Sequence, residues 1–163
     1  MKFVAKVLSD LRRETNKRNE ITGYLFCVRG LVFGYFITGE GSPGKVVDSK
    51  KRLRELENFY EKIRKEWGED LLAIPFHTHS KGTIEIYGER YATNPSKGDL
   101  ETMIENQWKE TYIFTPEYVI NLKRTGERRF RKALLPYKGY RITKPHRTYQ
   151  IPGKAYCVLP MEK

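Results

Sequence analysis

The stretch LLAIPFHTH at residues 71–79 decides how this chain folds. Its first six residues form a short continuous apolar run, which is typical of a strand buried within a sheet. Pro75 has no backbone N–H to donate, which argues against a fully paired central strand. The run ends in two histidines, and alternate residues of a strand face the same side. We therefore expect His77 and His79 to project from one face of the sheet.

A second polar motif, NPSKGD at residues 94–99, supplies a carboxylate that suits these two histidines. Imidazole nitrogen and Asp oxygen both bind zinc at about 2.0–2.2 Å, and a catalytic zinc keeps one position open by taking three protein ligands. His77, His79 and Asp99 make three. The sequence thus predicts a Zn²⁺ site built from these residues.

A third motif, EITGYL at residues 20–25, has the form Glu-x-x-Gly-x-Leu and precedes the other two. With these motifs in this order, the chain resembles the JAMM metalloprotease family, also called MPN+, over roughly residues 1–121. Two features depart from the family pattern. Ser80 stands where the family usually has proline after the second histidine, and the spacer between His79 and Ser96 has 16 residues, which is longer than usual.

The resemblance implies a fold, an activity and a substrate class. The implied fold is an α/β, cytidine-deaminase-like mixed sheet flanked by helices. The implied activity is zinc-dependent hydrolysis of a peptide or isopeptide bond. Glu20 would accept a proton from the metal-bound water and return it to the leaving amine, and Ser96 would hydrogen-bond the oxyanion. The implied substrate is the C-terminal tail of a ubiquitin-like protein, or a conjugate of such a protein with lysine.

Each motif also has a plainer interpretation. Ser96 and Asp99 have the spacing of a capping box at the start of a helix. Two histidines and a carboxylate can hold Fe(II) in an oxygenase, although that chemistry gives no role to Glu20. The third histidine, His146, lies among cationic residues that oppose metal binding, so we expect it at the surface.

The remaining pattern predicts alternating helices and strands. Apolar spacing predicts helices over 3–17 and 53–67, the second capped by Asp48 or Ser49, and a third helix that begins at Ser96. β-branched and aromatic runs predict a hairpin of strands 23–28 and 31–38, followed later by a strand over 112–122 that is interrupted at Pro116.

Two segments are predicted to carry features beyond this core. Residues 80–94 alternate like an inserted hairpin, which would border the cleft and offer a strand edge to a bound tail. Past Gly126 we expect short strands with turns at Pro136, Pro145 and Pro152-Gly153.

Length and composition set the frame for these elements. The 163 residues suit one domain spanning 1–163, with a core over about 1–121 and basic strands and turns over about 122–163. No apolar stretch is long enough to span a membrane and no signal peptide is evident, so we expect a cytoplasmic protein. Cys27 and Cys157 do not form a disulfide framework, and Cys27 is predicted to be a small core residue.

The net charge of +11 is concentrated near the C-terminus. Residues 121–148 hold ten Lys or Arg and one acid, Glu127. A solvated face is the simplest explanation, but interleaved aromatic residues make the tract 123–147 a candidate surface for nucleic acid or an acidic protein. The alternative function is therefore a binding module of the same fold.

Overall fold

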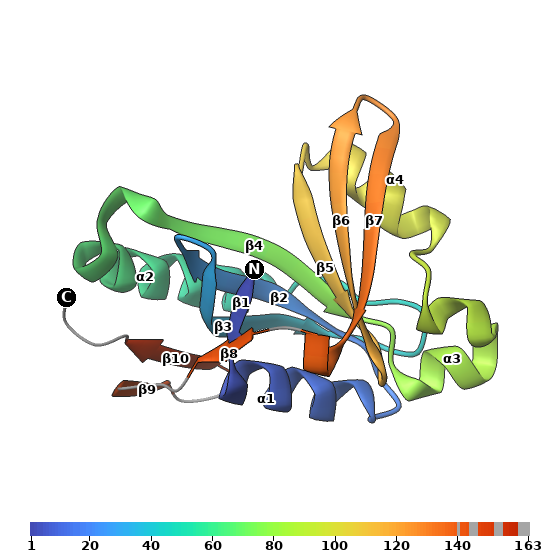
Figure 1. Cartoon of the computed structure of the whole chain (residues 1–163), viewed down its shortest axis with the longest axis horizontal. Coiled ribbons are helices and arrows are strands. Elements are labelled where there is room, and N and C mark those ends of the chain that lie inside the picture. Colours follow the sequence, from blue (N-terminus) through green and yellow to red (C-terminus); the bar gives the residue numbers. More distant parts are fainter. Residues whose placement is uncertain (140, 144–146, 152–154, 160–163) are drawn as a thin grey trace.

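The computed structural model describes residues 1–139, 141–143, 147–151 and 155–159 (Figure 1). The helices are α1 (Ala5–Thr15), α2 (Lys50–Trp67), α3 (Lys81–Tyr87) and α4 (Lys97–Glu105), with short 3₁₀ turns η1 (Gly68–Asp70), η2 (Glu89–Ala92) and η3 (Tyr137–Gly139). The strands are β1 (Lys2–Val4), β2 (Ile21–Val28), β3 (Leu31–Glu40), β4 (Leu71–Thr78), β5 (Glu110–Phe114), β6 (Tyr118–Gly126), β7 (Arg129–Pro136), β8 (Arg141–Thr143), β9 (Arg147–Ile151) and β10 (Ala155–Leu159).

These strands form a mixed sheet in the order β7-β6-β5-β4-β2-β3-β1-β8, and β10 pairs with both β3 and β9. The pairs β1–β3, β1–β8 and β4–β5 are parallel, whereas β2 pairs antiparallel with both β3 and β4. The α/β class with a mixed sheet is therefore confirmed. The strand with the two histidines lies inside this sheet, between β2 and β5.

Helices cover both faces of the β2–β3 hairpin. Tyr35 and Phe36 are neighbours on β3 and so face opposite sides of the sheet. The Tyr35 hydroxyl donates to Asp10 of α1 at 2.8 Å, while the Phe36 ring lies 5.7 Å from Phe59 of α2. The main core therefore has the sheet as its middle layer.

A second core lies where α4 covers the section formed by β5, β6 and β7. Met103 of α4 packs with three buried strand residues, Ile113, Ile120 and Leu122, and with partly buried Trp108 among others. Figure 1 shows β5, β6 and β7 rising away from the rest of the sheet with α4 alongside. We call the hairpin of β6 and β7 the ribbon.

A short seam joins the two parts of the sheet. β4 and β5 pair in parallel only over Phe76–Thr78, matched to Tyr112–Phe114. Pro75 precedes this seam, and its carbonyl accepts a hydrogen bond of 2.8 Å from the Thr111 hydroxyl of β5. The antiparallel register between β2 and β4 continues through Pro75 without a shift. Pro75 is therefore accommodated in a central strand, because β5 diverges from β4 at this point.

The helix predicted over 3–17 is confirmed as α1 with a later start, because Phe3 and Val4 belong to β1 and bury their side chains in the sheet. One predicted element is wrong. The segment 80–94 is a helix and a 3₁₀ turn, α3 and η2, and not a hairpin. The Ser80 hydroxyl caps α3 by accepting from the Thr83 N–H at 3.2 Å, and this cap outweighs the strand-like alternation of the sequence. The segment therefore offers no strand edge to a bound tail.

The other predicted elements are confirmed within small shifts of their ends. The hairpin turns at Arg29-Gly30, Ser49 caps α2, and the strand predicted over 112–122 divides into β5 and β6 around Pro116. The chain also turns after Pro136, through η3. The predicted turns at Pro145 and Pro152-Gly153 lie outside the described residues. No helix among the described residues is long and apolar enough to cross a membrane.

Candidate metal centre

His77 lies in β4 and His79 follows directly after the end of this strand, and the two side chains meet at one site, as expected. His77 pairs with Thr22 of β2, and the His79 N–H continues the alignment with β5 by donating to the Phe114 carbonyl at 2.9 Å. The His79 side chain is 3% exposed and that of His77 is 15% exposed. Both rings are thus held by the sheet with little freedom to turn toward solvent.

Asp99 reaches these rings from the first turn of α4, where it also completes the capping box. The Ser96 N–H donates to Asp99 Oδ2 at 2.7 Å, and the Asp99 N–H donates to Ser96 Oγ at 3.0 Å. Asp99 can therefore take part in the helix cap and face the histidines at the same time. The cap holds the carboxylate in the position from which it faces the histidines.

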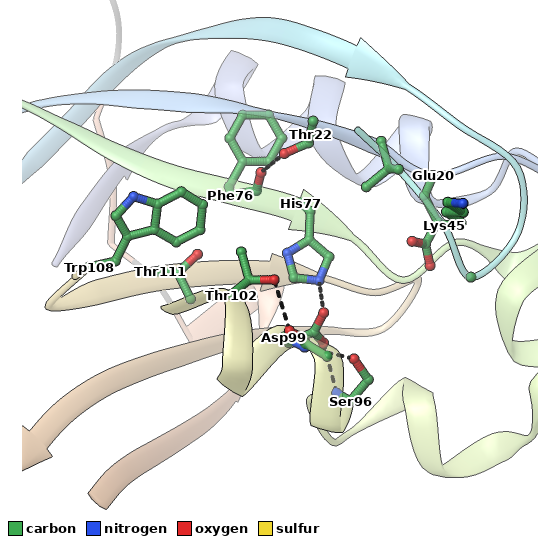
Figure 2. Close-up of a pocket in the computed structure, with 13 residues that line it drawn as sticks. Glu20, Thr22, Lys45, Phe76, His77, Ser96, Asp99, Thr102, Trp108 and Thr111 are labelled. Atoms are coloured by element: carbon green, nitrogen blue, oxygen red, sulfur yellow. Dashed lines mark hydrogen bonds and ion pairs between the residues drawn. The ribbon is translucent and has the colours of Figure 1, made fainter. Parts of the chain in front are cut away.

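The three side chains converge closely. His77 Nε2 lies 2.9 Å from Asp99 Oδ1, a contact that Figure 2 shows, and His79 Nε2 lies 2.9 Å from Asp99 Oδ2. One ligand atom of each residue lies within 4.8 Å of the others. This compact set of two imidazoles and one carboxylate is the group that the sequence predicted.

The direction of the His77 ring indicates a missing partner. Despite the short distance to Asp99, His77 Nε2 is buried and has no hydrogen-bond partner of acceptable geometry in the described part of the chain. A buried nitrogen without a partner is costly, and a metal ion bound between imidazole and carboxylate removes that cost. The donor set and this nitrogen together fit a divalent metal such as zinc.

His79 is oriented by a main-chain atom. Its Nδ1 lies 2.9 Å from the Tyr91 carbonyl oxygen of η2, and a carbonyl can only accept, so Nδ1 carries the proton. Nε2 is then the nitrogen that faces Asp99 and can bind a metal. A ligating histidine commonly donates its other N–H in this way, which fixes the tautomer and the ring orientation.

Opposite charges shape the ionisation of this group. Burial raises the pKa of the Asp99 carboxyl, but the charges of His77 and His79 and the hydrogen bond from His79 outweigh burial and hold that pKa well below its usual range. Burial lowers the pKa of His77, but the nearby Asp99 and Glu20 carboxylates raise it by more, so the net shift is upward. Asp99 is therefore a carboxylate, the form that binds a metal.

Glu20 lies beside this group without belonging to it. It immediately precedes β2, and the antiparallel register that pairs Thr22 with His77 brings Glu20 opposite His79. Its carboxylate is 4% exposed and accepts a hydrogen bond of 2.6 Å from the Thr83 hydroxyl. Burial is the largest influence on the Glu20 side chain, and the net effect is a raised pKa. A buried carboxyl with a raised pKa next to a metal site is suited to take up a proton.

The metal ligands and Glu20 border a cavity of about 240 Å³ and a second hollow of about 170 Å³. Glu20, Gly44, Ser96 and Asp99 line both. Figure 2 shows Glu20 and Lys45 on one side of His77, with Trp108 and Thr111 on the other. The five predicted site residues therefore line two neighbouring hollows, with His77 at the first and His79 at the second.

Sequence reasoning missed two contributions to the site, both from the long spacer. Thr83 holds Glu20, and the Tyr91 carbonyl holds His79. The Ser80-x-x-Thr83 spacing of a helix cap was a usable signal for the first. A main-chain carbonyl has no signal in the sequence. His146, predicted to lie at the surface, is outside the described residues.

Comparison of the sequence with models of known protein families and with curated protein sequences finds no match.

Proposed function

We propose that the chain is a zinc-dependent peptidase or isopeptidase of JAMM type. The observation that carries this proposal is the convergence of His77, His79 and Asp99, with Glu20 buried beside them and lining the same cavity. A solely structural role for these residues gives no reason to bury a carboxylate of raised pKa next to the group. The specific JAMM fold and a cytoplasmic location are part of the same proposal.

In this proposal His77, His79 and Asp99 hold the metal. A zinc ion bound there supplies Lewis acidity, which lowers the pKa of a bound water to about 7. Glu20 then acts as general base and general acid. Its carboxylate takes a proton from the attacking water and delivers it to the leaving amine, while the Thr83 hydroxyl keeps the carboxylate in place.

In the same proposal, Ser96 hydrogen-bonds the oxyanion that forms at the attacked carbonyl. Its Oγ accepts the Asp99 N–H in the capping box, which uses a lone pair and leaves the hydroxyl proton able to donate. Ser96 also lines both hollows next to Asp99. The proposed substrate is the C-terminal tail of a ubiquitin-like protein or its lysine conjugate, as the family resemblance implies.

The ligand set alone also suits Fe(II), as in oxygenases with two histidines and one carboxylate. The position of Glu20 favours hydrolysis, because a general base beside the metal has a direct use there and none in binding oxygen. Metal analysis distinguishes the two assignments.

The first test is metal content. Purified wild type should carry one zinc per chain, and His77→Ala or Asp99→Asn should lose it because two remaining ligands compete poorly with water. Asparagine keeps an oxygen that can accept from the Ser96 N–H, so the helix cap is preserved. His146→Ala is the matched control and should retain zinc. Full zinc content in the His77 and Asp99 variants would place the metal elsewhere.

The second test is hydrolysis by Glu20→Gln. The variant should keep zinc and lose activity on a modifier-lysine conjugate by roughly 10²–10⁴-fold, the usual contribution of a general base. Near wild-type turnover with zinc bound would contradict the role of Glu20.

A second candidate function rests on the ribbon. Lys123 and Arg131 lie directly opposite each other on β6 and β7, and both are exposed, as is Arg129. Glu110 lies 3.9 Å from Lys123 and gives it an acidic partner, whereas neither Arg129 nor Arg131 forms an ion pair within the described part of the chain. This supports a second proposal, that the ribbon binds nucleic acid, since a two-stranded ribbon also fits the major groove of DNA.

A further inference from the structure

The segment between β3 and α2 reaches the metal centre through one tight turn, SPGK at residues 42–45. Its second residue is proline and its third is glycine with a φ of 80°, as in a type II turn. The Lys45 N–H donates to the Ser42 carbonyl at 3.1 Å and closes the turn. The main-chain position of Lys45 is therefore fixed by a hydrogen-bonded turn.

Helix α3 holds this turn against the site. The Gly44 N–H donates to the Thr83 hydroxyl oxygen at 3.0 Å, and the same hydroxyl donates to the Glu20 carboxylate at 2.6 Å. The Tyr87 ring packs so closely on Gly44 that a Cβ at that position would lie 2.5 Å from the ring. One threonine thus anchors both Glu20 and the turn that carries Lys45.

Lys45 brings a positive charge to the edge of the cavity. It is the one lysine or arginine among the residues that line the two hollows. Its side chain is exposed and forms no ion pair with an acid in the described part of the chain. An ammonium group in this position suits a carboxylate of a bound ligand, because a hydrogen bond between opposite charges is stronger than a neutral one.

Lys45 lies on the side from which the leaving amine departs. Figure 2 shows Lys45 and Glu20 on the same side of His77. In the proposed function Glu20 protonates the leaving amine, so the leaving group lies on that side of the metal. When the leaving group is the last residue of a chain, a free carboxylate is bonded to the carbon next to the departing nitrogen. The ε-amine of a lysine within a protein has no carboxylate so close.

We propose that Lys45 is a specificity residue that binds the free α-carboxylate of a leaving C-terminal amino acid. The inference rests on the proposed function and narrows its substrate class. The favoured substrate is a precursor in which one terminal residue follows the tail of the ubiquitin-like protein. Hydrolysis breaks the amide C–N bond, adds the hydroxyl of water to the tail carbonyl and gives the proton to the amine of the released amino acid.

The test measures binding of two peptides that differ only in this charge. The probes are acetyl-Gly-Gly-Ala with a free carboxylate and the same peptide with a C-terminal amide. Calorimetry uses zinc-loaded Glu20→Gln protein, which should hold the metal without consuming the peptides. The free acid should bind roughly tenfold more tightly than the amide, and this preference should shrink as salt is added. Zinc content is measured on every sample.

Three further variants are made in the same Glu20→Gln background. Lys45→Gln should reduce the preference for the free acid to less than about threefold, whereas Lys45→Arg should keep it. Lys97→Gln is the matched control, because Lys97 is exposed beside Ser96 but lines neither hollow. It should keep the full preference. A peptide carboxylate that bound the zinc directly would keep its preference in Lys45→Gln.

The outcomes separate the two proposals. Equal affinities for acid and amide, no measurable binding of the free acid, or a preference that survives Lys45→Gln would overturn the role of Lys45 and leave the metal site intact. Equal losses in Lys45→Gln and Lys97→Gln would also overturn it, because net charge alone would then attract the carboxylate. Absence of zinc from the wild type would overturn the proposed function and this inference with it.

Discussion

At the scale of single residues, Glu20 shows a conflict between stability and proposed activity. Burial raises the pKa of the Glu20 carboxyl above its ordinary value, so the folded protein binds this proton more tightly than the unfolded chain does. As pH rises through the raised pKa, the ionised carboxylate remains buried and the free energy of unfolding falls. The useful base is therefore a destabilising residue at neutral pH.

We predict that Glu20→Gln stabilises the zinc-free protein, and more so at higher pH. Glutamine keeps the acceptor for the Thr83 hydroxyl but does not ionise. The gain should be smallest below pH 4.5, where the carboxyl is protonated in both states of the wild type, and should grow as pH rises toward neutrality. Urea unfolding at several pH values with chelator present measures it. A gain independent of pH would contradict the buried, proton-binding role of Glu20.

At the scale of elements, the caps of α2 and α3 form a natural pair for comparison. Ser49 caps α2 by accepting from the Arg52 N–H, and Ser80 caps α3 by accepting from the Thr83 N–H. α2 contributes no residue to the lining of either hollow. α3 carries Thr83, and η2, which follows it, carries the Tyr91 carbonyl. The same loss of a cap should therefore have different consequences at the site.

We predict that Ser49→Ala lowers the free energy of unfolding by about 1 kcal/mol, the usual cost of losing a helix cap. Ser80→Ala should cost more, because the buried Ser80 hydroxyl also donates to the Arg18 carbonyl at 2.7 Å. The Ser80 variant should also bind zinc more weakly, because its helix positions partners of Glu20 and His79. Competition with a fluorescent zinc chelator measures the affinity. Unchanged affinity in the Ser80 variant would show that the spacer does not support the metal centre.

The ribbon allows an equally matched comparison. Arg129 and Arg131 are exposed, whereas Lys132 contacts the Asn94 side chain at 2.9 Å and Arg128 pairs with Glu101 at 3.2 Å. We predict that Arg129→Gln/Arg131→Gln weakens binding to duplex DNA and reduces the slope of log affinity against log salt by about two.

The control for the ribbon is Arg128→Gln/Lys132→Gln, which removes the same charge from residues already engaged by the protein. Its salt slope should change by less than half as much as that of the Arg129 and Arg131 variant. Equal effects in both double variants would show that net charge, and not this face of the ribbon, attracts the nucleic acid.

Much of the fold was predictable from local patterns, and the exceptions have physical reasons. The apolar run before His77 and the Gly30 turn report directly on burial and backbone geometry, so β4 and the β2–β3 hairpin were predicted correctly. The segment after Ser80 was not, because Thr83 and Ile84 alternate like a strand while the Ser80 cap favours a helix. A segment whose apolar and polar residues alternate becomes a strand only when a neighbouring strand pairs with it. The sequence of the segment itself does not indicate whether such a partner is present.

The same distinction applies to the site. The three ligands and Glu20 were predicted because their side chains carry the chemistry in recognisable spacings. The role of Ser96 in fixing Asp99 followed from the same motif, although the cap and the ligand were weighed as alternatives. Trp108 and the main-chain partner of His79 depend on how α4 and η2 pack, which no spacing in the sequence indicates.

At the scale of the whole molecule, the proposed metal ligands lie on both sides of the seam between the two cores. His77 belongs to β4, which packs in the main core, whereas Asp99 belongs to α4, which covers β5, β6 and β7. Besides the short parallel pairing, Phe114 of β5 packs against Phe76 of β4, and a metal held by His77 and Asp99 would add a link from α4 to β4. Binding of the metal would stabilise the folded protein by about 4 kcal/mol when the free metal concentration is a thousand times the dissociation constant.

We predict that zinc slows amide hydrogen exchange in α4, β5 and the ribbon more than in α1 and α2. α4 and most of the ribbon join the main core through β5, so an added link from α4 to β4 should suppress their local opening. Mass spectrometry of exchange with and without zinc measures the difference, and His77→Ala should show none. Uniform protection of all helices would indicate that the protein opens only as one unit.

The hydrogen bond from His79 to the Tyr91 carbonyl limits what a mutational scan can reveal about this site. A scan that replaces every side chain in turn leaves every main-chain oxygen in the chain, so the partner that orients His79 survives the scan untouched. Substitution of Tyr91 removes a ring that packs edge-on against His79 at a centroid distance of 5.4 Å, but it leaves the carbonyl in place, so its effect does not report on this hydrogen bond. Exchanging the Tyr91–Ala92 amide for an ester by chemical synthesis weakens that carbonyl as an acceptor, and it would show how much the metal centre depends on it.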